Sequence, residues 1–583
     1  MTFFDVLSLI GGLSLFLFGM NVMGSALEKR AGGQLKVLLG KLTGSKLAGF
    51  LTGLGVTAVI QSSSATTVMV VGFVNSGLMT LKQAIHVIMG ANVGTTVTAW
   101  LLSLASITGT GFFMQLLKPS SFTPVLALIG IILIMTGKDK RKDTGTILLG
   151  FAVLMYGMEA MSAAVSPLRS SESFRNLLLL FSNPVLGVLA GAVFTAIIQS
   201  SSASVGVLQA LSSTGAITMA SAIPIIMGQN IGTCVTAMLS SIGANTNARR
   251  AAVVHLSFNI IGTAVMLLVF CAVRAMLQPA FLALPATAAS IAVAHSLFNI
   301  ACTAILLPAS GLLEKLSIAI VPEKRTKQDS DPLLDERLLA TPAIAVERCR
   351  VAALGMAREA FEAVRLSMQA LVSYSPALGD KIRELEDSTD RYEDRLGTYL
   401  LTLARQPMTA SDSDESGRLL HMISDFERVA DHAVNILESA EELHAKKIEL
   451  PLDAQEELAT LERAVREISS LSLQAFETGD LASASRVEPL EQVIDTLKDQ
   501  LRTRQIARLQ KGACSLETGF IWTDLLTNFE RVADHCSNIA GCVLETQHKS
   551  LDLHEYLDGV KQSAPEFRRE YEAYSRKYAL GCI

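Results

Sequence analysis

Two apolar segments of this chain, residues 47–77 and 185–215, are interrupted near their middle by the same four residues. The interruptions read Gln61-Ser62-Ser63-Ser64 and Gln199-Ser200-Ser201-Ser202. Apolar runs of about 20 residues are typical of bilayer spans, and lipid does not tolerate unpaired backbone groups. The breaks therefore predict helices that are discontinuous within a membrane, where they pack against protein or line an aqueous site.

The interruptions belong to an internal repeat with a constant offset of 138 residues. Residues 57–68 match residues 195–206 at 8 of 12 positions, and residues 87–99 match residues 225–237 at 9 of 13. One offset shared by separate segments indicates two copies of one unit. The sequence thus predicts a membrane domain over 1–320, with repeat 1 at about 5–110, repeat 2 at about 143–248 and extra helices over 251–310.

Charge divides the chain near Val321. The residues up to this point hold 17 Lys and Arg against 7 Asp and Glu, whereas the residues after it hold 32 against 47. This contrast excludes a single globular domain and a purely soluble protein. No basic stripe is present, so a nucleic-acid partner is not expected.

Basic residues in the loops indicate how the two copies cross the membrane. In repeat 1 the loop after the first helix (predicted at residues 4–24) carries five basic residues, whereas its counterpart carries only Arg169 and Arg175. The loop near 102–112 has no charge, but its counterpart holds Arg249 and Arg250. If basic loops face the cytoplasm, the copies cross in opposite senses. Inverted repeats with discontinuous helices are typical of secondary transporters; a fusion of two parallel units is the alternative.

The broken segments have the chemistry of an ion site. Backbone N–H groups and serine hydroxyls at the start of a half-helix suit an oxyanion, and carbonyls at the end of the preceding half suit Na⁺. Neither motif contains Arg or Lys, so an anion would need cations bound beside it. Glu159 is the only carboxylate predicted well inside an apolar segment, which favours Na⁺ over H⁺ as the coupling ion. Close helix packing by small residues is the alternative.

A second motif pair accompanies the first. It reads GANVGTTVT from Gly90 to Thr98 and GQNIGTCVT from Gly228 to Thr236. Its glycines let a backbone unwind or approach a ligand, while its Asn and Thr side chains supply oxygens and donors.

With these strings, the two QSSS segments resemble the sodium-dependent phosphate cotransporter family, type II and bacterial, over roughly residues 5–310. The region from about 340 to 550, which contains ERVADH twice, resembles a PhoU-like domain. The first resemblance implies that phosphate and sodium bind at thirteen positions: Gln61, Ser62, Ser63, Ser64, Thr66, Asn92, Thr95, Gln199, Ser200, Ser201, Ser202, Asn230 and Thr233.

The C-terminal region has a repeat of its own. Residues 423–436 resemble 526–539, and residues 385–396 resemble 490–501. Its composition of Ala, Leu, Glu and Arg with helical periodicity predicts a soluble pair of bundles with about three helices each. We expect a linker over 321–340, the PhoU-like domain over 341–550, and a tail over 551–583.

Carboxylates in this region recur at i, i+4 spacing and so share helix faces. Divalent metals or iron bind such oxygen-rich faces, and PhoU-like domains are similar in carrying E-x-x-x-D metal faces. The candidate ligands are Glu386, Asp390, Glu427, Asp431, Glu491, Asp495, Glu530 and Asp534. A solvated surface with ion pairs to Arg428 and Arg531 is the alternative.

Together these patterns predict an all-α polytopic protein of the cytoplasmic membrane, with a cytoplasmic C-terminal domain. The expected function is sodium-coupled transport of inorganic phosphate by alternating access, regulated by the PhoU-like region. A phosphate exporter and a membrane-anchored signalling adaptor are the alternatives. No nucleophile–base pair or nucleotide loop indicates an enzyme. A homodimer or a phosphate-signalling protein bound to the C-terminal region would be a further partner.

Overall fold

The computed structural model describes residues 2–41, 45–106, 118–137, 139–172, 181, 183–323, 334–548 and 565–581. Over these residues every regular element is a helix, and one isolated β-bridge joins Thr218 and Pro285, which confirms the predicted all-α class. The chain divides into two compact units. The first comprises residues 1–345 and 406–410, and the second comprises residues 346–405 and 411–583.

The first copy of the repeat begins with a helix that is longer than its apolar stretch. The sequence predicted a helix over residues 4–24 followed by a loop, but α1 runs from Phe3 to Lys41. A fall in hydropathy marks where a helix leaves the apolar environment, not where it ends. The copy continues through α2 (Lys46–Ile60), α3 (Ser63–Asn75), α4 (Leu81–Gly94), α5 (Thr96–Ser103) and η1 (Leu104–Ser106).

The second copy follows the same plan. After α7 (Pro119–Thr136), it contains α8 (Asp139–Val165), η2 (Ser166–Ser170), α10 (Pro184–Ile198), α11 (Ser201–Ser212) and α12 (Met219–Ser240). Here α12 is continuous where the first copy divides into α4 and α5. Arg175, one of the basic residues used to predict orientation, lies outside the described residues.

Further helices complete the first unit: α13 (Thr246–Met276), η3 (Ala280–Ala283), α14 (Ala288–Leu306), α15 (Ser310–Ile320) and η4 (Glu336–Ala340). Among the described residues, six helical stretches are long and apolar enough to cross a bilayer: Phe3–Arg30, Leu81–Ser103, Lys140–Arg169, Met219–Ser240, Thr246–Met276 and Ala288–Leu306. The halves of the broken segments are shorter. A helix of 15 residues such as α2 or α10 extends only about 22 Å, less than the roughly 30 Å hydrocarbon core.

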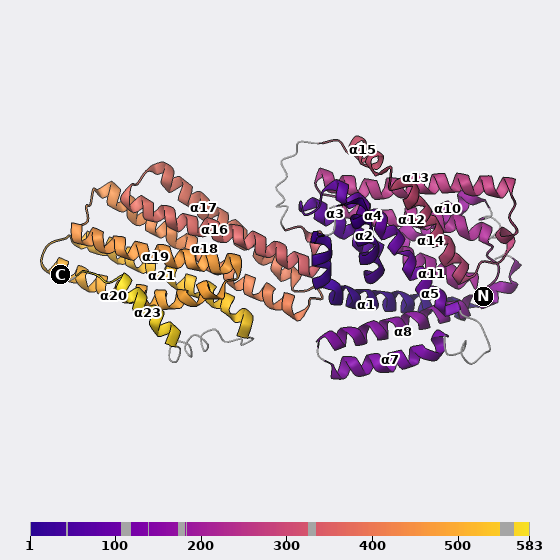
Figure 1. The fold of residues 1–583 in the computed structure, drawn as a ribbon, viewed down its shortest axis with the longest axis horizontal. Coiled ribbons are helices and arrows are strands. Elements are labelled where there is room, and N and C mark those ends of the chain that lie inside the picture. Colours follow the sequence, from indigo (N-terminus) through magenta and orange to yellow (C-terminus); the bar gives the residue numbers. More distant parts are fainter. Residues whose placement is uncertain are drawn as a thin grey trace. The chain divides into compact units, whose positions relative to one another are not determined.

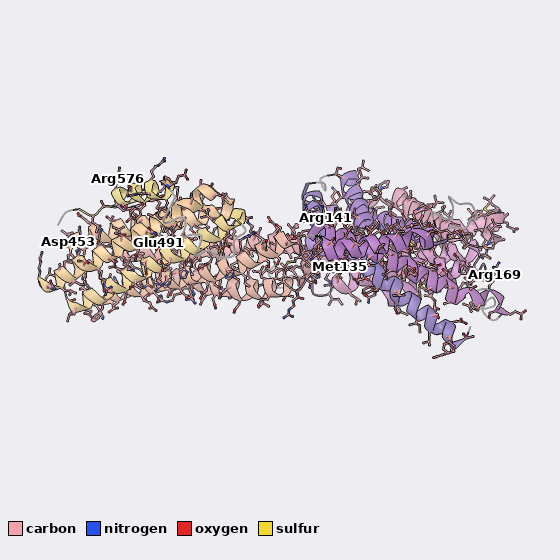
Figure 2. All side chains as sticks on the ribbon, turned by 90° about the horizontal axis from the view of Figure 1, so that it is seen from below. Met135, Arg141, Arg169, Asp453, Glu491 and Arg576 are labelled. Atoms are coloured by element: carbon pink, nitrogen blue, oxygen red, sulfur yellow. The ribbon has the colours of Figure 1, made fainter. Side chains whose placement is uncertain are left out.

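The first helices of the two copies, α1 and α8, lie side by side at close range (Figure 1). Glycines make this approach possible: a Cβ added at Gly19 would lie 2.4 Å from the backbone nitrogen of Leu154, and one at Gly157 would lie 2.3 Å from that of Phe16. Gly19 and Gly157 are themselves equivalent positions of the repeat. Small residues let membrane helices pack backbone to backbone. Figure 2 labels Arg141 and Arg169, which lie at opposite ends of the α8 stretch.

Helix α13 shows that the two copies are inverted. At its start, the side chain of Asn75, the last residue of α3, accepts a hydrogen bond from the amide of Asn245 (2.7 Å). Beyond its end, the amide of Ala286 donates to the carbonyl of Ile217, in the loop between α11 and α12 (2.7 Å). The 31 residues of α13 span about 46 Å, more than the hydrocarbon core. The loop after α3 and the equivalent loop after α11 therefore lie near opposite ends of a helix that is long enough to cross the membrane.

The segment that ends the first unit is attached to α3. Residues 324–333 of the predicted linker lie outside the described residues, but η4 packs on α3, where Leu338 is fully buried close to Gly72. Asn75 donates to Asp335 (2.6 Å), and the Arg337 guanidinium donates to the carbonyls of Ser240 and Ile242. This segment thus ties the end of the broken hairpin of repeat 1 to the end of α12.

The second unit consists of long helices. They are α16 (Pro342–Val372), α17 (Pro376–Leu403), α18 (Ala410–Lys446), α19 (Leu452–Thr478), α20 (Leu481–Gln510), α21 (Leu516–His548) and α23 (Pro565–Lys577). The Phe426 ring of α18 lies 6.5 Å from Phe361 of α16 and 5.1 Å from Phe476 of α19. Those aromatic contacts join the two halves of the unit in one core.

Part of the predicted tail is also folded. Residues 551–564 lie outside the described residues, whereas α23, which carries the labelled Arg576, lies against α20 (Figure 2). Arg486 of α20 donates to the hydroxyl of Tyr574 (2.8 Å), and Tyr578 is buried after the helix. The described end of the chain is therefore part of the second unit.

Candidate functional site

Each broken segment turns at its glutamine. Gln61 and Gln199 have positive φ angles of 62° and 58° and end α2 and α10 in the left-handed region. This region is costly for a side-chain-bearing residue and persists only where the surroundings determine it. The next helices begin at once, because the hydroxyls of Ser62 and Ser200 accept hydrogen bonds from the amides of Ala65 and Ala203 (3.2 Å each). The predicted interruptions are confirmed as a helix end followed directly by a helix start.

Matched hydroxyl pairs hold the halves together behind each turn. Thr57 donates to Thr66 (3.0 Å) in the first copy, and Thr195 donates to Ser204 (2.8 Å) at the equivalent positions of the second. All four side chains are buried. Thr66, predicted as a binding residue, makes this contact and does not line the cavity described next, so its binding role stays a prediction.

The two turns meet at a cavity of about 380 Å³. Its lining includes Ser62, Ser63 and Ser64 of the first copy and Ser200, Ser201 and Ser202 of the second, as well as Gln61. The Ser64 hydroxyl and the Gln199 carbonyl oxygen are 3.5 Å apart across the repeat boundary. The structure thus brings together the equivalent serines of the two copies, which are 138 positions apart in sequence. Gln199 contributes through this carbonyl and is not part of the lining.

The cavity suits an anion accompanied by cations. It faces the first turns of both α3 and α11, where free backbone N–H groups and the positive ends of the helix dipoles favour an oxyanion. The end of α2 lines the cavity with Ile60 and Gln61, and the carbonyl of Gln199, which follows α10, lies 3.5 Å from the Ser64 hydroxyl. Carbonyl oxygens at helix ends suit a hard cation. No Lys or Arg is among the described residues that line the cavity. The negative charge of an oxyanion would thus be offset by dipoles, hydroxyls and co-bound cations.

The second motif pair lies in α4, α5 and α12, outside the lining of the cavity. Asn92, Thr95, Asn230 and Thr233 are buried but do not line the cavity. Three of the four donate to carbonyls one turn earlier in their own helix, at 2.9–3.0 Å. The Asn92 amide nitrogen has no hydrogen-bond partner among the described residues. A binding role for these four residues stays a prediction.

The glycines of this motif pair have a packing role. A Cβ at Gly90 would lie 1.9 Å from the carbonyl oxygen of Phe50 in α2, and one at Gly228 would lie 1.9 Å from that of Val188 in α10. The motif therefore lets α4 and α12 support the first half of each broken segment. Thr98 of α5 adds a hydrogen bond to the Gln61 side-chain oxygen (2.8 Å).

One wall of the cavity was missed by the sequence analysis. Asn21, Ser25 and Glu28 of α1 line it together with Leu17, Met20 and Gly24. The helix predicted over residues 4–24 includes Asn21 in its last turn, whereas Ser25 and Glu28 fall in the predicted loop after it. Their spacing, i, i+4 and i+7, was the available signal, because it places all three on one face of a continued helix. Glu159, the carboxylate that the sequence singled out, is exposed on α8.

The acidic faces of the second unit differ between its halves. In the first half, burial and the neighbouring Asp431 raise the pKa of Glu427 to about 7, and burial together with Asp431 also raises the pKa of Glu386. Asp390 lies one turn further along α17 from Glu386. A raised pKa means that the negative charge of a carboxylate is not balanced by nearby positive charges, as expected where a bound cation would supply the balance.

The second half supplies its own cation. The Lys498 ammonium lies 2.9 Å from Asp495 and 3.0 Å from Glu530. Asp534 pairs with Arg531 (3.3 Å), although burial and Glu530 raise its pKa. The sequence position of Lys498 corresponds to Glu393 in the first half, and Glu491 lies two turns earlier on the same helix. Among the described residues, no group of three or more His, Cys, Asp or Glu side chains is arranged to hold a metal.

Comparison with known proteins finds two families along the chain. The Na+/Pi-cotransporter family matches residues 15–163 and 153–285, and the PhoU domain matches residues 354–440 and 458–543. The chain is 25% identical over 559 residues to the "Putative inorganic phosphate export protein YjbB" of Escherichia coli (strain K12), covering 94% of this chain and 99% of that protein.

Two other relatives cover less of the chain. It is 30% identical over 310 residues to the uncharacterized protein YqeW of Bacillus subtilis (strain 168), covering 53% of this chain and 96% of that protein. It is 44% identical over 106 residues to the sodium-dependent phosphate transport protein 2A of Ovis aries, covering 18% of this chain and 16% of that protein. Among solved structures, PhoU from Pseudomonas aeruginosa is similar at 22% identity and a TM-score of 0.34, covering 35% of this chain and 97% of that one.

Proposed function

Since the chain belongs to the Na+/Pi-cotransporter family and carries PhoU domains after its membrane helices, we propose that it is a sodium-coupled transporter of inorganic phosphate in the cytoplasmic membrane. The observation that carries this proposal is the cavity where the serine triplets of both repeats meet. Phosphate binds there between the N-termini of α3 and α11, held by serine hydroxyls and backbone amides. Sodium ions bind beside it at the carbonyl ends of α2 and α10.

Transport follows from the inversion of the repeats. Because equivalent loops lie on opposite membrane faces, each broken hairpin reaches the same central site from its own side. A change in how the two copies pack against each other would open the cavity to one side and close it to the other, as alternating access requires. Gln61 and Gln199 act as the turning points, and the hydroxyl pairs behind them keep each turn intact.

A flux measurement with purified protein in proteoliposomes tests the proposal. The wild type should show phosphate flux that depends on a sodium gradient. Ser63→Ala combined with Ser201→Ala should abolish most of it, because both half-helices lose a donor to the anion. Ser103→Ala is the matched control, since that hydroxyl bonds to the carbonyl of Trp100 outside the cavity. Absence of sodium-dependent phosphate flux in the wild type would refute the proposed function.

Export is the second candidate, and it is favoured by the relative named as a phosphate exporter, which aligns over 99% of its length. The same residues would line the cavity of an importer or of an exporter, so the direction has to be measured. Vesicles loaded with phosphate and sodium on one side only, with the protein's orientation determined, separate the two. Flux only from the side of the C-terminal unit would identify an exporter.

The C-terminal unit is proposed to be cytoplasmic and to regulate transport through a metal on its first half. Among the described residues no lysine is paired with Glu386, Glu427 or Asp431. Their side chains are not already arranged around a metal, so a divalent metal or iron would be held by their oxygens only once these side chains turn toward it. The second half does not fit a metal equally well, because Lys498 already neutralises Asp495 and Glu530. If the unit instead signals on its own, phosphate signalling should persist in the Ser63→Ala and Ser201→Ala variant.

A further inference from the structure

The α1 wall of the cavity carries a negative charge. Among the described residues that line the cavity, Glu28 is the only ionisable one. It shares the cavity with all six serines of the two QSSS motifs. Asn21 and Ser25 lie on the same face of α1, and their side-chain oxygens are 3.5 Å apart. An anion site is thus bordered by a carboxylate flanked by two neutral oxygen groups.

The cations nearest to Glu28 in the sequence are engaged elsewhere. Lys29 forms an ion pair with Asp143 of α8 (3.3 Å), and Arg30 donates to the carbonyl of Lys140 and to the hydroxyl of Thr144. Within the described part of the chain, Glu28 itself makes no hydrogen bond or ion pair. Its carboxylate is partly buried and lines the cavity, and none of the side chains that the structure describes is paired with it as a counter-charge.

A bare carboxylate would weaken phosphate binding, because two anions in one partly enclosed cavity repel each other. A cation held by the carboxylate removes this repulsion and adds an attraction. Oxygen atoms from carboxylate, amide and hydroxyl groups are the ligands that a hard cation prefers. Phosphate would then bind well only after the cation, which couples the two ions within one cavity.

We propose that Glu28, together with Asn21 and Ser25, forms a sodium site on the α1 wall of the cavity, and that this site adds one sodium ion to each phosphate transported. The inference rests on the proposed function and names a residue set outside the QSSS motifs. Glu28 is here a cation ligand, and it affects phosphate through the cation that it holds.

The test compares Glu28→Gln with the wild type in proteoliposomes, with the uptake of labelled sodium and labelled phosphate measured in parallel. Glu28→Gln should transport one sodium ion fewer per phosphate and should need at least tenfold more sodium for half-maximal flux. Glu28→Asp should restore the wild-type ratio. Glu159→Gln is the matched control, because that carboxylate is exposed on α8 away from the cavity. An unchanged sodium-to-phosphate ratio in Glu28→Gln would overturn the proposal.

Sodium binding to the detergent-purified protein gives a readout that does not require transport. Sodium chloride, compared with choline chloride, should raise the melting temperature of the wild type more than that of Glu28→Gln. An equal sodium-specific shift in both proteins would count against the site even if the variant no longer transports. If Glu28→Gln keeps its sodium ratio and only its pH profile of flux changes, the group carries a proton and the sodium site is refuted. Failure of the proposed function is distinguishable, since the wild type itself would then show no sodium-dependent flux.

Discussion

Lys498 shows how one substitution between repeats changes the chemistry of a surface. Its ammonium pairs with Asp495 and with Glu530, two of the carboxylates that the sequence proposed as metal ligands. We expect the wild type to bind one Mn²⁺ per chain in the C-terminal unit. Lys498→Glu should raise this to two, because it supplies the carboxylate that Glu393 provides in the first half. Calorimetric titration with Mn²⁺ checks the number.

Lys381→Glu is the control for this change, because it reverses the charge of an exposed lysine on α17 that pairs with Glu384. It should leave the number of bound metal ions at one. Two metal ions in the wild type, or one in Lys498→Glu, would contradict the role given to Lys498.

The raised pKa of Glu427 predicts a pH dependence of stability. Its ordinary pKa is 4.5, and burial with Asp431 nearby raises it to about 7 in the folded chain. Between these values the folded state holds a proton that the unfolded chain releases, so the free energy of unfolding falls as pH rises. In metal-free buffer, the melting temperature of the second unit should be lower at pH 8 than at pH 5.5, and Glu427→Gln should reduce this difference.

Trp522 provides the measurement, since it is fully buried in α21 and reports unfolding of the second unit once Trp100 is changed to Phe. Some pH dependence should remain in Glu427→Gln, because burial also raises the pKa of Glu462 to about 7. An identical pH dependence with and without Glu427 would show that this carboxyl is not protonated in the folded state.

At the scale of single residues, the sequence predicted the serines of the cavity but not its carboxylate. The serines were found because an exact repeat of QSSS inside apolar segments has few structural explanations. Glu28 was missed because the apolar stretch ends at about residue 24, although the helix continues to Lys41. Gly, Asn and Thr residues serve both ligand binding and close helix packing. For this reason the second motif pair was grouped with the site, including Asn92, Thr95, Asn230 and Thr233. Only the three-dimensional structure shows which of these residues line the cavity and which pack between helices.

At the scale of elements, the packing of α4 on α2 depends on glycine. Gly90→Ala would place a methyl group 1.9 Å from the carbonyl oxygen of Phe50, so the two helices must move apart. We expect a loss of about 1–3 kcal/mol in stability and a lower melting temperature in detergent. Gly55→Ala, in α2 itself, meets no atom within 4 Å and should not lower it. Equal melting temperatures for the two variants would show that the contact is not tight.

The attachment of η4 to α3 is a second element-scale test. Arg337 donates to the carbonyls of Ser240 and Ile242 and pairs with Asp335. Hydrogen bonds from a charged group contribute about 1.5–3 kcal/mol. In Arg337→Ala, amide hydrogen exchange in residues 334–340 should therefore be more than about tenfold faster. Glu336→Gln should leave the exchange unchanged, because its side chain is exposed. Unchanged exchange in Arg337→Ala would mean that Leu338 alone holds the segment.

At the scale of the whole molecule, inversion of the repeats was predicted from charges in the loops. In the structure, other residues support the inversion. Arg250, counted as a loop charge, is buried in α13 and donates to the carbonyl of Val321 (3.0 Å). The inversion is supported by α13 instead, because the loop after α3 lies near the start of this helix and the loop after α11 lies near its end. Sequence alone could not supply it, because the contacts join segments about 70 to 170 residues apart.

Cysteine labelling tests the inversion directly. Leu78 and Ala216 are equivalent residues of the two loops, and Leu78 is exposed. In a chain whose native cysteines are replaced by alanine, Leu78→Cys and Ala216→Cys should react with a membrane-impermeant thiol reagent from opposite sides of sealed vesicles. Because Asn75 contacts Asp335, just before the C-terminal unit, Leu78→Cys should be labelled from the side that holds that unit. Labelling of both positions from one side would mean that the copies are parallel, and the two hairpins could not then approach the serine cavity from opposite faces.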